Sequence, residues 1–118
     1  MDLEGKVAIV TGGNSGMGRA ISKSLAGEGV KVALLARNRE KRDAVQKEIQ
    51  SDGGTAGSFP ADLTEPEQIT EAVDKAADEW GQLDIVINNA GLGIFKTVED
   101  MELEDWDKHI DVMLRGAF

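Results

Sequence analysis

The fold is decided by the stretch KVAIVTGGNSGMG, which occupies residues 6–18 of a chain of 118 residues. Its first part is mainly apolar and rich in β-branched side chains, a pattern that predicts a buried strand over residues 6–11. Glycines follow at once and indicate a tight turn. Met17, Ala20, Ile21 and Leu25 then recur at helical spacing, so a helix is expected over residues 16–28.

The rest of the chain repeats this alternation. Further strands are expected over residues 30–35, 55–59 and 83–87, and helices over residues 39–50, 64–80 and from about 102 toward the C-terminus. Apolar strands that alternate with amphipathic helices are typical of a parallel sheet covered on both faces. Right-handed crossovers and short loops favour a doubly wound α/β sheet of about four strands, in the order 3-2-1-4. We expect residues 1–118 to form a single unit.

Two helices carry the clearest patterns. The residues of the first share one face and are Ile69, Ala72, Val73, Ala76, Ala77 and Trp80. Thr64 is expected to cap this helix, with Glu67 completing a capping box. The last helix has an apolar stripe made of Trp106, Ile110, Met113 and Ala117, and this stripe is expected to pack. His109 falls on the polar side, where we expect it to be exposed to solvent.

The composition excludes several classes of protein. Thirteen Lys and Arg against 22 Asp and Glu give a formal charge of −9, which argues against nucleic acid and anionic membranes as partners. No stretch has the apolar length of a membrane span, and the acidic start lacks the features of a signal peptide, so a cytoplasmic location is expected. There is no cysteine and one histidine, which excludes disulfides and His-rich metal centres. There is also no tyrosine.

The glycines after the first strand indicate a site for an anion. Gly12, Gly16 and Gly18 permit a tight turn and a close backbone approach, while the N–H groups of the helix N-terminus face outward. This arrangement predicts phosphate binding. The alternative is a tight turn that serves only helix packing.

The order and spacing of four motifs carry a resemblance. They are LEGKVAIVTG with the glycines after it, ADLT at residues 61–64, NNAG at residues 88–91 and EDWD at residues 104–107. Together they resemble the N-terminal half of the short-chain dehydrogenase/reductase family over essentially the whole chain. The resemblance implies a Rossmann-like, NAD(P)-binding fold and an oxidoreductase ancestry.

The resemblance also implies a role for particular residues. Those that hold the cofactor pyrophosphate would be Gly12, Asn14, Ser15, Gly16, Met17 and Gly18. Asp62 would accept a hydrogen bond from the adenine amino group, with Leu63 beside the ring, and Asn89, Ala90 and Gly91 would line the ribose and stabilise the sheet. Alternatively, Asp62 is an ordinary loop carboxylate and the asparagines only end a strand.

The end of the second strand bears on the choice of cofactor. An Asp there would favour NAD, whereas this chain has Arg37, which can pair with a 2′-phosphate in a place where no carboxylate is expected to repel it. We therefore expect weak binding of NADP in preference to NAD. Ser15 weakens this expectation, because many NADP-preferring relatives carry a basic residue there. The alternative is that Arg37 is a solvated surface cation.

The catalytic pattern of the family is missing. Such enzymes use Asn, Ser, Tyr and Lys, with Tyr as the general acid/base, but this chain has no Tyr and carries Met113 where the Asn would fall. Three interpretations stay open: a nucleotide-binding half without turnover, the first part of a full-length enzyme, or a self-standing assembly unit. For the third, the strand at residues 83–87 would leave a sheet edge open to a homodimer. The alternative is a monomer whose last helix covers that edge.

Overall fold

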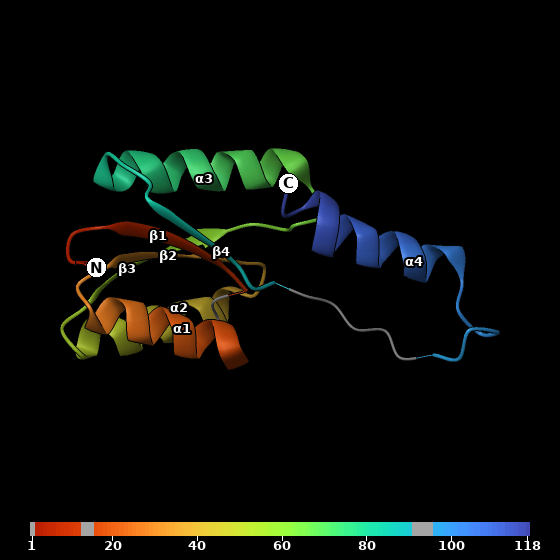
Figure 1. Cartoon of the computed structure of the whole chain (residues 1–118), viewed down its shortest axis with the longest axis horizontal. Helices are drawn as coiled ribbons and strands as arrows, with labels where there is room; N and C mark the ends of the chain where they lie inside the picture. Colours follow the sequence, from red (N-terminus) through yellow and green to blue (C-terminus); the bar gives the residue numbers. More distant parts are fainter. Residues whose placement is uncertain (1, 13–15, 91–95) are drawn as a thin grey trace.

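The computed structural model describes residues 2–12, 16–90 and 96–118. Strands and helices alternate along the chain (Figure 1). The elements are β1 (Val7–Thr11), α1 (Gly16–Gly27), β2 (Lys31–Ala36), α2 (Arg39–Ser51), β3 (Thr55–Pro60), α3 (Pro66–Trp80), β4 (Ile85–Asn88), α4 (Leu103–Ile110) and the π-helical segment η1 (Asp111–Arg115). The predicted succession of elements is confirmed, with bounds that differ by one or two residues.

The four strands form one parallel sheet in the order β3-β2-β1-β4, as predicted. The central pair runs in register from Val7 opposite Lys31 to Thr11 opposite Leu35. Every strand therefore points the same way, and all four carboxyl ends lie at one edge of the layer. This arrangement brings together segments that lie more than 70 residues apart in the sequence.

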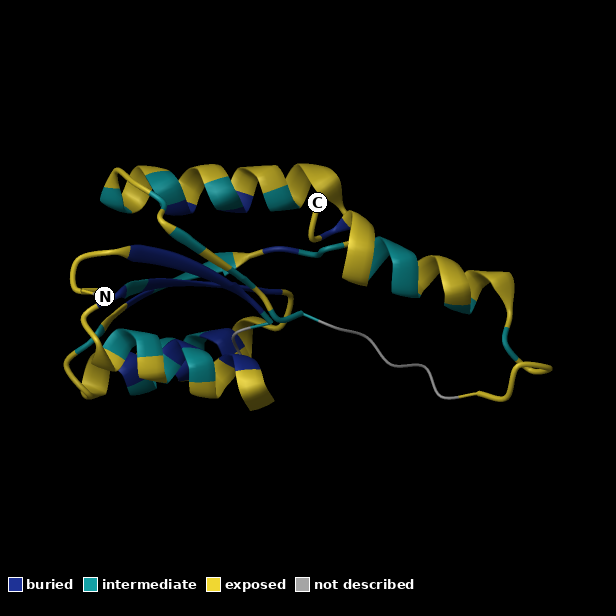
Figure 2. Cartoon of the chain, in the orientation of Figure 1, coloured by how far each residue is buried: buried dark blue, intermediate teal, exposed yellow. Residues whose placement is uncertain are grey.

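The helices cover the sheet on both faces, with α1 and α2 on one side and α3 on the other (Figure 1). Under α1 and α2, Val32 and Leu34 pack with Val45 and Ile49 of α2. The opposite core contains Ile9 and Leu35 of the strands and two alanines of α3, Ala72 and Ala76. The two central strands, β1 and β2, are the most deeply buried part of the described chain (Figure 2). Burial on both faces explains why β1 and β2 read as continuous apolar runs rather than alternating patterns.

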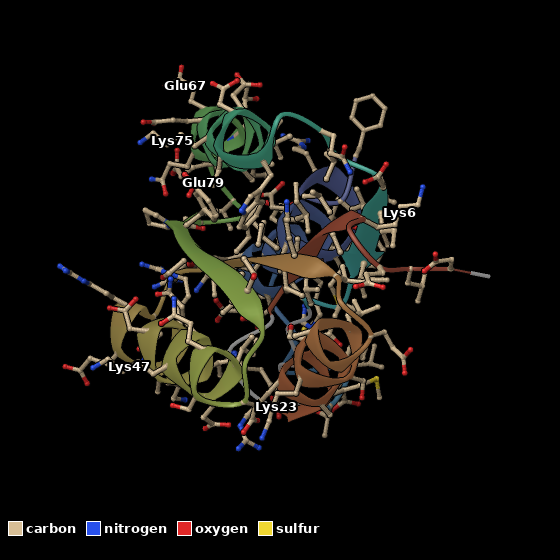
Figure 3. All side chains as sticks on the ribbon, turned by 90° about the vertical axis from the view of Figure 1, so that its left-hand side faces the viewer. Lys6, Lys23, Lys47, Glu67, Lys75 and Glu79 are labelled. Atoms are coloured by element: carbon tan, nitrogen blue, oxygen red, sulfur yellow. The ribbon has the colours of Figure 1, made fainter. Side chains whose placement is uncertain are left out.

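The outward faces of these helices are charged. Figure 3 shows Lys47 of α2 and Glu67 of α3 on opposite sides of the molecule, both directed away from the sheet. In the described part of the chain, no helix combines the length and the apolar character that crossing a membrane requires.

Helix α3 keeps its predicted buried face but not its predicted cap. Ala72 and Ala76 are buried, and the other four residues of the expected face are at least partly covered. The N-cap is Glu65 rather than Thr64, because Pro66 occupies the first helical position, where its fixed φ suits the start of a helix. Thr64 instead donates its hydroxyl proton to Asp62, so the expected capping box is wrong.

Helix α1 keeps only part of its predicted face: Leu25 packs against the core and Ile21 is partly buried, whereas the other two residues are exposed. Met17 is 73% exposed and Ala20 is exposed, whereas Gly18 and Ser22 are buried. These two small residues let α1 approach the loop after β1 closely, and the Ser22 hydroxyl is satisfied by donating to the Gly18 carbonyl at 2.7 Å. Apolar periodicity missed this face because close packing here needs small residues rather than large apolar ones.

The expected stripe on the last helix does not pack. Trp106 is 61% exposed and Met113 is 52% exposed. The α-helix ends at Ile110 and continues as η1, where the Gly116 amide bonds back five residues to the Asp111 carbonyl at 2.8 Å. The wider turn changes the angular spacing only after Ile110, whereas Trp106 is exposed within the α-helix itself. Helix α4 lies beyond the carboxyl ends of the strands, largely exposed (Figure 2).

Candidate functional site

The carboxyl ends of the strands gather most of the candidate residues. Thr11 pairs with Leu35 on one side and with Asn88 on the other, so Gly12, Arg37 and Asn89 all follow directly from strand ends at one edge. Asp62 comes two residues after β3 ends at Pro60, next to the end of β2. Ligands of open parallel sheets bind outside these carboxyl ends. The topology thus places the sequence-predicted residues around one region.

The side chain of Thr11 ties β1 to β4. Its hydroxyl donates to the Ile87 carbonyl at 3.3 Å and accepts from the amides of Asn89 and Ala90, each at 3.1 Å. One buried hydroxyl therefore fixes the path of the chain as it leaves β4. The sequence predicts no separate role for Thr11. The signal that could have indicated one is a threonine at the end of the buried run of residues 6–11.

The loop after β1 needs its glycines. Gly12 has a φ of +67° and Gly16 a φ of +57°, both in the left-handed region that favours glycine. A Cβ on Gly18 would lie far inside contact distance of the Gly12 carbonyl oxygen and of the Asn89 amide nitrogen. The backbone of Gly18 thus packs directly against the Gly12 carbonyl, and any side chain at position 18 would displace that carbonyl.

Asn89 supports this loop directly. Its side-chain amide donates to the Gly12 carbonyl at 3.2 Å, which joins the loop after β4 to the loop after β1. The expectation that Asn89 stabilises the sheet is consistent with this bond, whereas its contact with a ribose stays a prediction. Gly16 and Met17 are exposed at the start of α1. Three further candidates, Asn14, Ser15 and Gly91, lie outside the described residues.

Asp62 is held as a carboxylate by its own loop. Its Oδ1 accepts from the Thr64 amide at 2.9 Å and from the Thr64 hydroxyl at 2.7 Å. These hydrogen bonds, the hydroxyl's first, lower the pKa of Asp62, and the charge of Arg37 adds to the effect. The side chain is 27% exposed. Asp62 therefore presents an ionised acceptor to solvent. Leu63 beside it is partly buried.

Arg37 extends from the end of β2 with 77% of its side chain exposed. Its Nε lies 3.9 Å from Asp62 Oδ2. The expectation that no carboxylate stands near Arg37 is therefore wrong. It failed because it considered only the second strand, whereas the Asp62 carboxylate arrives from the neighbouring end of β3.

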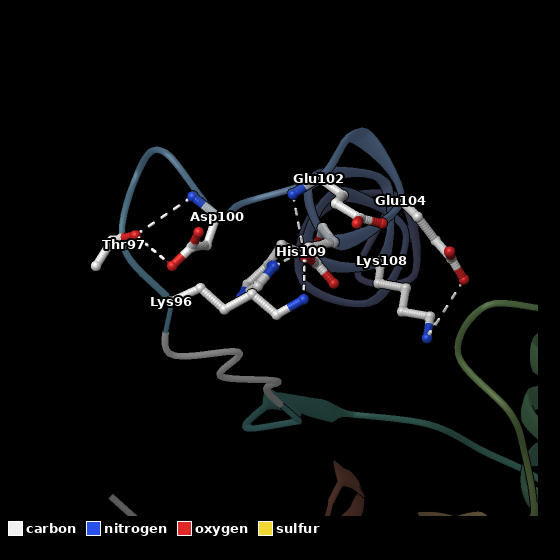
Figure 4. A network of polar contacts seen from close by, with 8 residues as sticks. Lys96, Thr97, Asp100, Glu102, Glu104, Lys108 and His109 are labelled. Carbon is white, nitrogen blue, oxygen red and sulfur yellow. Dashed lines mark hydrogen bonds and ion pairs between the residues drawn. The ribbon is translucent and has the colours of Figure 1, made fainter.

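A second polar network lies at the start of α4 (Figure 4). Asp105 Oδ2 accepts from Lys96 Nζ at 2.8 Å and from the Glu102 amide at 3.1 Å. The hydrogen bond from Lys96 is the main cause that lowers the pKa of Asp105. These groups cap the helix.

His109, expected to be exposed, is partly buried, with its Nδ1 2.7 Å from the Asp105 carbonyl oxygen. The His109 ring therefore contacts the backbone of its own helix, because Asp105 lies one turn earlier in α4. Among the described residues, no group of three or more His, Asp or Glu side chains could hold a metal ion.

The comparisons with known proteins agree with this geometry. Residues 6–118 match the family model for the short chain dehydrogenases. An uncharacterised oxidoreductase of Staphylococcus saprophyticus is 38% identical over 118 residues, which cover 99% of this chain and 50% of that protein. A mutant of a Serratia marcescens short-chain dehydrogenase/reductase superposes with a TM-score of 0.95 at 36% identity, covering 100% of this chain and 49% of that one.

A metagenomic short-chain oxidoreductase in complex with NADP superposes with a TM-score of 0.92 at 38% identity, covering 98% of this chain and 53% of that one. The chain belongs to the short-chain dehydrogenase family, and its sheet is the Rossmann-like sheet of the family's N-terminal half. It spans about half the length of the relatives that it matches.

The contact between Gly18 and Gly12 gives a first prediction. Gly18→Ala should lower the free energy of unfolding by about 1–3 kcal/mol, since the loop after β1 must move to admit a methyl group. The measurement is urea denaturation followed by circular dichroism.

Gly27→Ala is the matched control on the same helix, because nothing lies within 4 Å of a Cβ there. It should change the stability by no more than about 0.5 kcal/mol. Equal stability of the two variants would contradict the tight packing of Gly18.

Proposed function

We propose that residues 1–118 form a single dinucleotide-binding unit that takes the adenosine half of NADP, weakly, in preference to NAD. The observation that carries the proposal is the exposed guanidinium of Arg37 at the end of β2, next to the glycine loop at the N-terminus of α1. The residues proposed to contact the cofactor are Gly12, Asn14, Ser15, Gly16, Met17, Gly18, Arg37, Asp62, Leu63, Asn89, Ala90 and Gly91.

The described residues suit such a ligand. The left-handed turns at Gly12 and Gly16 allow backbone close to a pyrophosphate, and the start of α1 supplies N–H groups and a positive helix end. Asp62 keeps an ionised oxygen available for an adenine amino group. Arg37 meets Asp62 only at 3.9 Å, so a 2′-phosphate could draw it away at little loss. In a bound dinucleotide, the nicotinamide supplies the hydride chemistry.

A titration tests the choice of cofactor. NADPH should bind the chain more tightly than NADH, and Arg37→Ala should remove the difference. Loss of one charge-assisted hydrogen bond costs about 1.5–3 kcal/mol, roughly ten- to hundredfold in affinity. Quenching of tryptophan fluorescence reports the binding.

Arg19→Ala is the control for this titration, because Arg19 pairs with Glu48 on the surface and should leave both affinities unchanged. Equal affinities of the unmodified chain for NADPH and NADH would contradict the preference for NADP. An Arg37→Ala variant that still prefers NADPH would exclude Arg37 as its source.

We further propose that the 118-residue polypeptide by itself binds cofactor without turnover. Reduction of a carbonyl needs a proton donor beside the hydride, and general acid–base catalysis typically contributes 10²–10⁴-fold. The sequence contains no tyrosine to act as the phenolic acid of this family. The polar position that the family fills with Asn is Met113, which is 52% exposed in η1.

Activity assays check this second proposal. The polypeptide should oxidise no NADPH with aldehyde or ketone substrates, and Met113→Asn should restore no activity, because the amide alone supplies no proton donor. A carbonyl-dependent rate that copurifies with the polypeptide through several columns would contradict the proposal.

A second candidate function is self-association. Strand β4 pairs with β1 on one side, and no other described strand pairs with its other side. Val86 on this strand is 53% exposed, and the three residues 85–87 are apolar and β-branched. An open edge of this kind pairs readily with another strand. We therefore propose a two-fold homodimer of the 118-residue polypeptide that buries this edge or the exposed surface of the last helix.

Sedimentation equilibrium at micromolar concentration measures the proposed dimer. Val86→Lys should shift the mass from dimer to monomer, since a lysine on the edge strand opposes pairing. Val98→Lys is the control, because Val98 is 92% exposed away from the strands and should leave the mass unchanged. A monomer mass for the unmodified chain would end this proposal.

A further inference from the structure

Arg42 is the one charged side chain that is buried in the described part of the chain. It is 4% exposed, although it lies in the first turns of α2, a helix that otherwise covers the sheet with Val45 and Ile49. Burial is the largest influence on its pKa and lowers it, while the neighbouring Asp43 carboxylate acts in the opposite direction. Arginine stays protonated in proteins, so a full charge is kept out of water here. Apolar periodicity gave no sign of it.

The guanidinium of Arg42 has defined partners on two strands. Its Nη1 donates to the Ala36 carbonyl at 2.6 Å, and its Nε donates to the Ser58 hydroxyl at 2.5 Å. The same Ala36 carbonyl accepts the Ala61 amide at 3.2 Å. Arg42 thus joins the end of β2 to β3 from within α2.

The peptide that Arg42 holds is the one that carries Arg37. The carbonyl of Ala36 and the amide and Cα of Arg37 belong to a single planar unit, so fixing the Ala36 oxygen fixes the point from which the Arg37 side chain extends. Few contacts hold the Arg37 side chain itself, which is 77% exposed and 3.9 Å from its carboxylate partner. The placement of the Arg37 guanidinium therefore depends mainly on the backbone from which the side chain extends.

The same network also reaches Arg39. The Ser58 hydroxyl accepts from Arg42 and donates to Asp43 Oδ1 at 2.8 Å, and Asp43 Oδ2 lies 3.5 Å from Arg39 Nε. The hydrogen bond from Ser58 is the main reason that the pKa of Asp43 is lowered. Arg37, Arg39 and Arg42 line one shallow surface depression with Asp43, Gln46, Ser58 and Pro60.

We infer that Arg42 is a positioning residue for cofactor discrimination. It holds the turn between β2 and α2 so that the exposed guanidinium groups of Arg37 and Arg39 face the place of an adenosine 2′-phosphate. Arg42 does not itself take the phosphate, since it is only 4% exposed and its Nε and Nη1 donate within the protein. This inference rests on the proposed preference for NADP at Arg37. A buried ion is a costly way to fill space, which fits a role in geometry rather than in packing.

The test compares two small ligands, adenosine 2′,5′-bisphosphate and adenosine 5′-monophosphate, which differ only in the 2′-phosphate. Calorimetric titration of the 118-residue chain gives the ratio of their dissociation constants. Arg42→Met, which keeps the apolar stem, should reduce the preference for the bisphosphate about tenfold while leaving the affinity for the monophosphate unchanged. Arg42→Lys, with one donor able to reach the Ala36 carbonyl, should recover part of the preference.

Two further variants keep the test decisive. Arg19→Met removes an arginine from a surface ion pair with Glu48 and should leave the ratio as it is. Ser58→Ala removes one partner of Arg42 and serves where Arg42→Met fails to fold. It should reduce the preference by a smaller factor. An Arg42→Met variant that keeps the full preference, or that loses both ligands equally, would overturn the inference.

Amide hydrogen exchange of residues 36–39 separates this inference from the proposed function. If the unmodified chain binds the two ligands equally, the preference for NADP is wrong. Faster exchange in Arg42→Met than in Arg19→Met then still supports a positioning role. Unchanged exchange at these amides would overturn the positioning role even in a chain that prefers the bisphosphate.

Discussion

The hydroxyl of Thr11 is the contact on which the candidate site depends. It bridges the ends of β1 and β4, with one bond donated to the Ile87 carbonyl and two accepted from the amides that follow β4. Two strands that lie more than 70 residues apart in sequence are thus joined by a side chain in addition to their backbone pairing. Asn89 adds a bond to the Gly12 carbonyl, and the bare Cα of Gly18 fits beneath both. The position of Gly12, where the glycine loop begins, is therefore set by the sheet and by α1 together.

The neighbouring half of the site is organised by charge rather than by close packing. Asp62 is kept ionised by Thr64 and faces Arg37, while Asp43 is kept ionised by Ser58 and faces Arg39. In each pair a hydroxyl group orders the carboxylate, and the arginine stays exposed. Such pairs on a surface contribute little to stability and are screened by salt, so they can open when a stronger anion arrives. Two exposed arginines thus lie near the same strand ends in a chain whose net charge is acidic.

The sheet order and the helix layers could be predicted from the sequence, because apolar periodicity reports them directly, and Arg37 and Asp62 could each be placed at a strand end, Asp62 through the family resemblance. The buried face of α1 could not, since Gly18 and Ser22 carry little apolar signal and are chosen for close approach. The carboxylate beside Arg37 was missed because it belongs to another strand. The π-helical turn after Ile110 changes the spacing that made Met113 look like a packing residue. Arg42 was missed because a charged residue is expected to face solvent, and only its partners on two strands explain its burial.

The mixed character of the inner face of α2 limits how this helix can move. Val45 and Ile49 alone would tolerate sliding along the sheet, since one apolar contact replaces another. Arg42, one turn before Val45, would be carried away from the Ala36 carbonyl and into apolar surroundings by a shift of one helical turn, about 5.4 Å. The helix is therefore locked in register at its N-terminal end. Gln46, one turn further along, donates to the Ala56 carbonyl at 3.0 Å and holds the same register, so the end of α2 beside the candidate site stays in place.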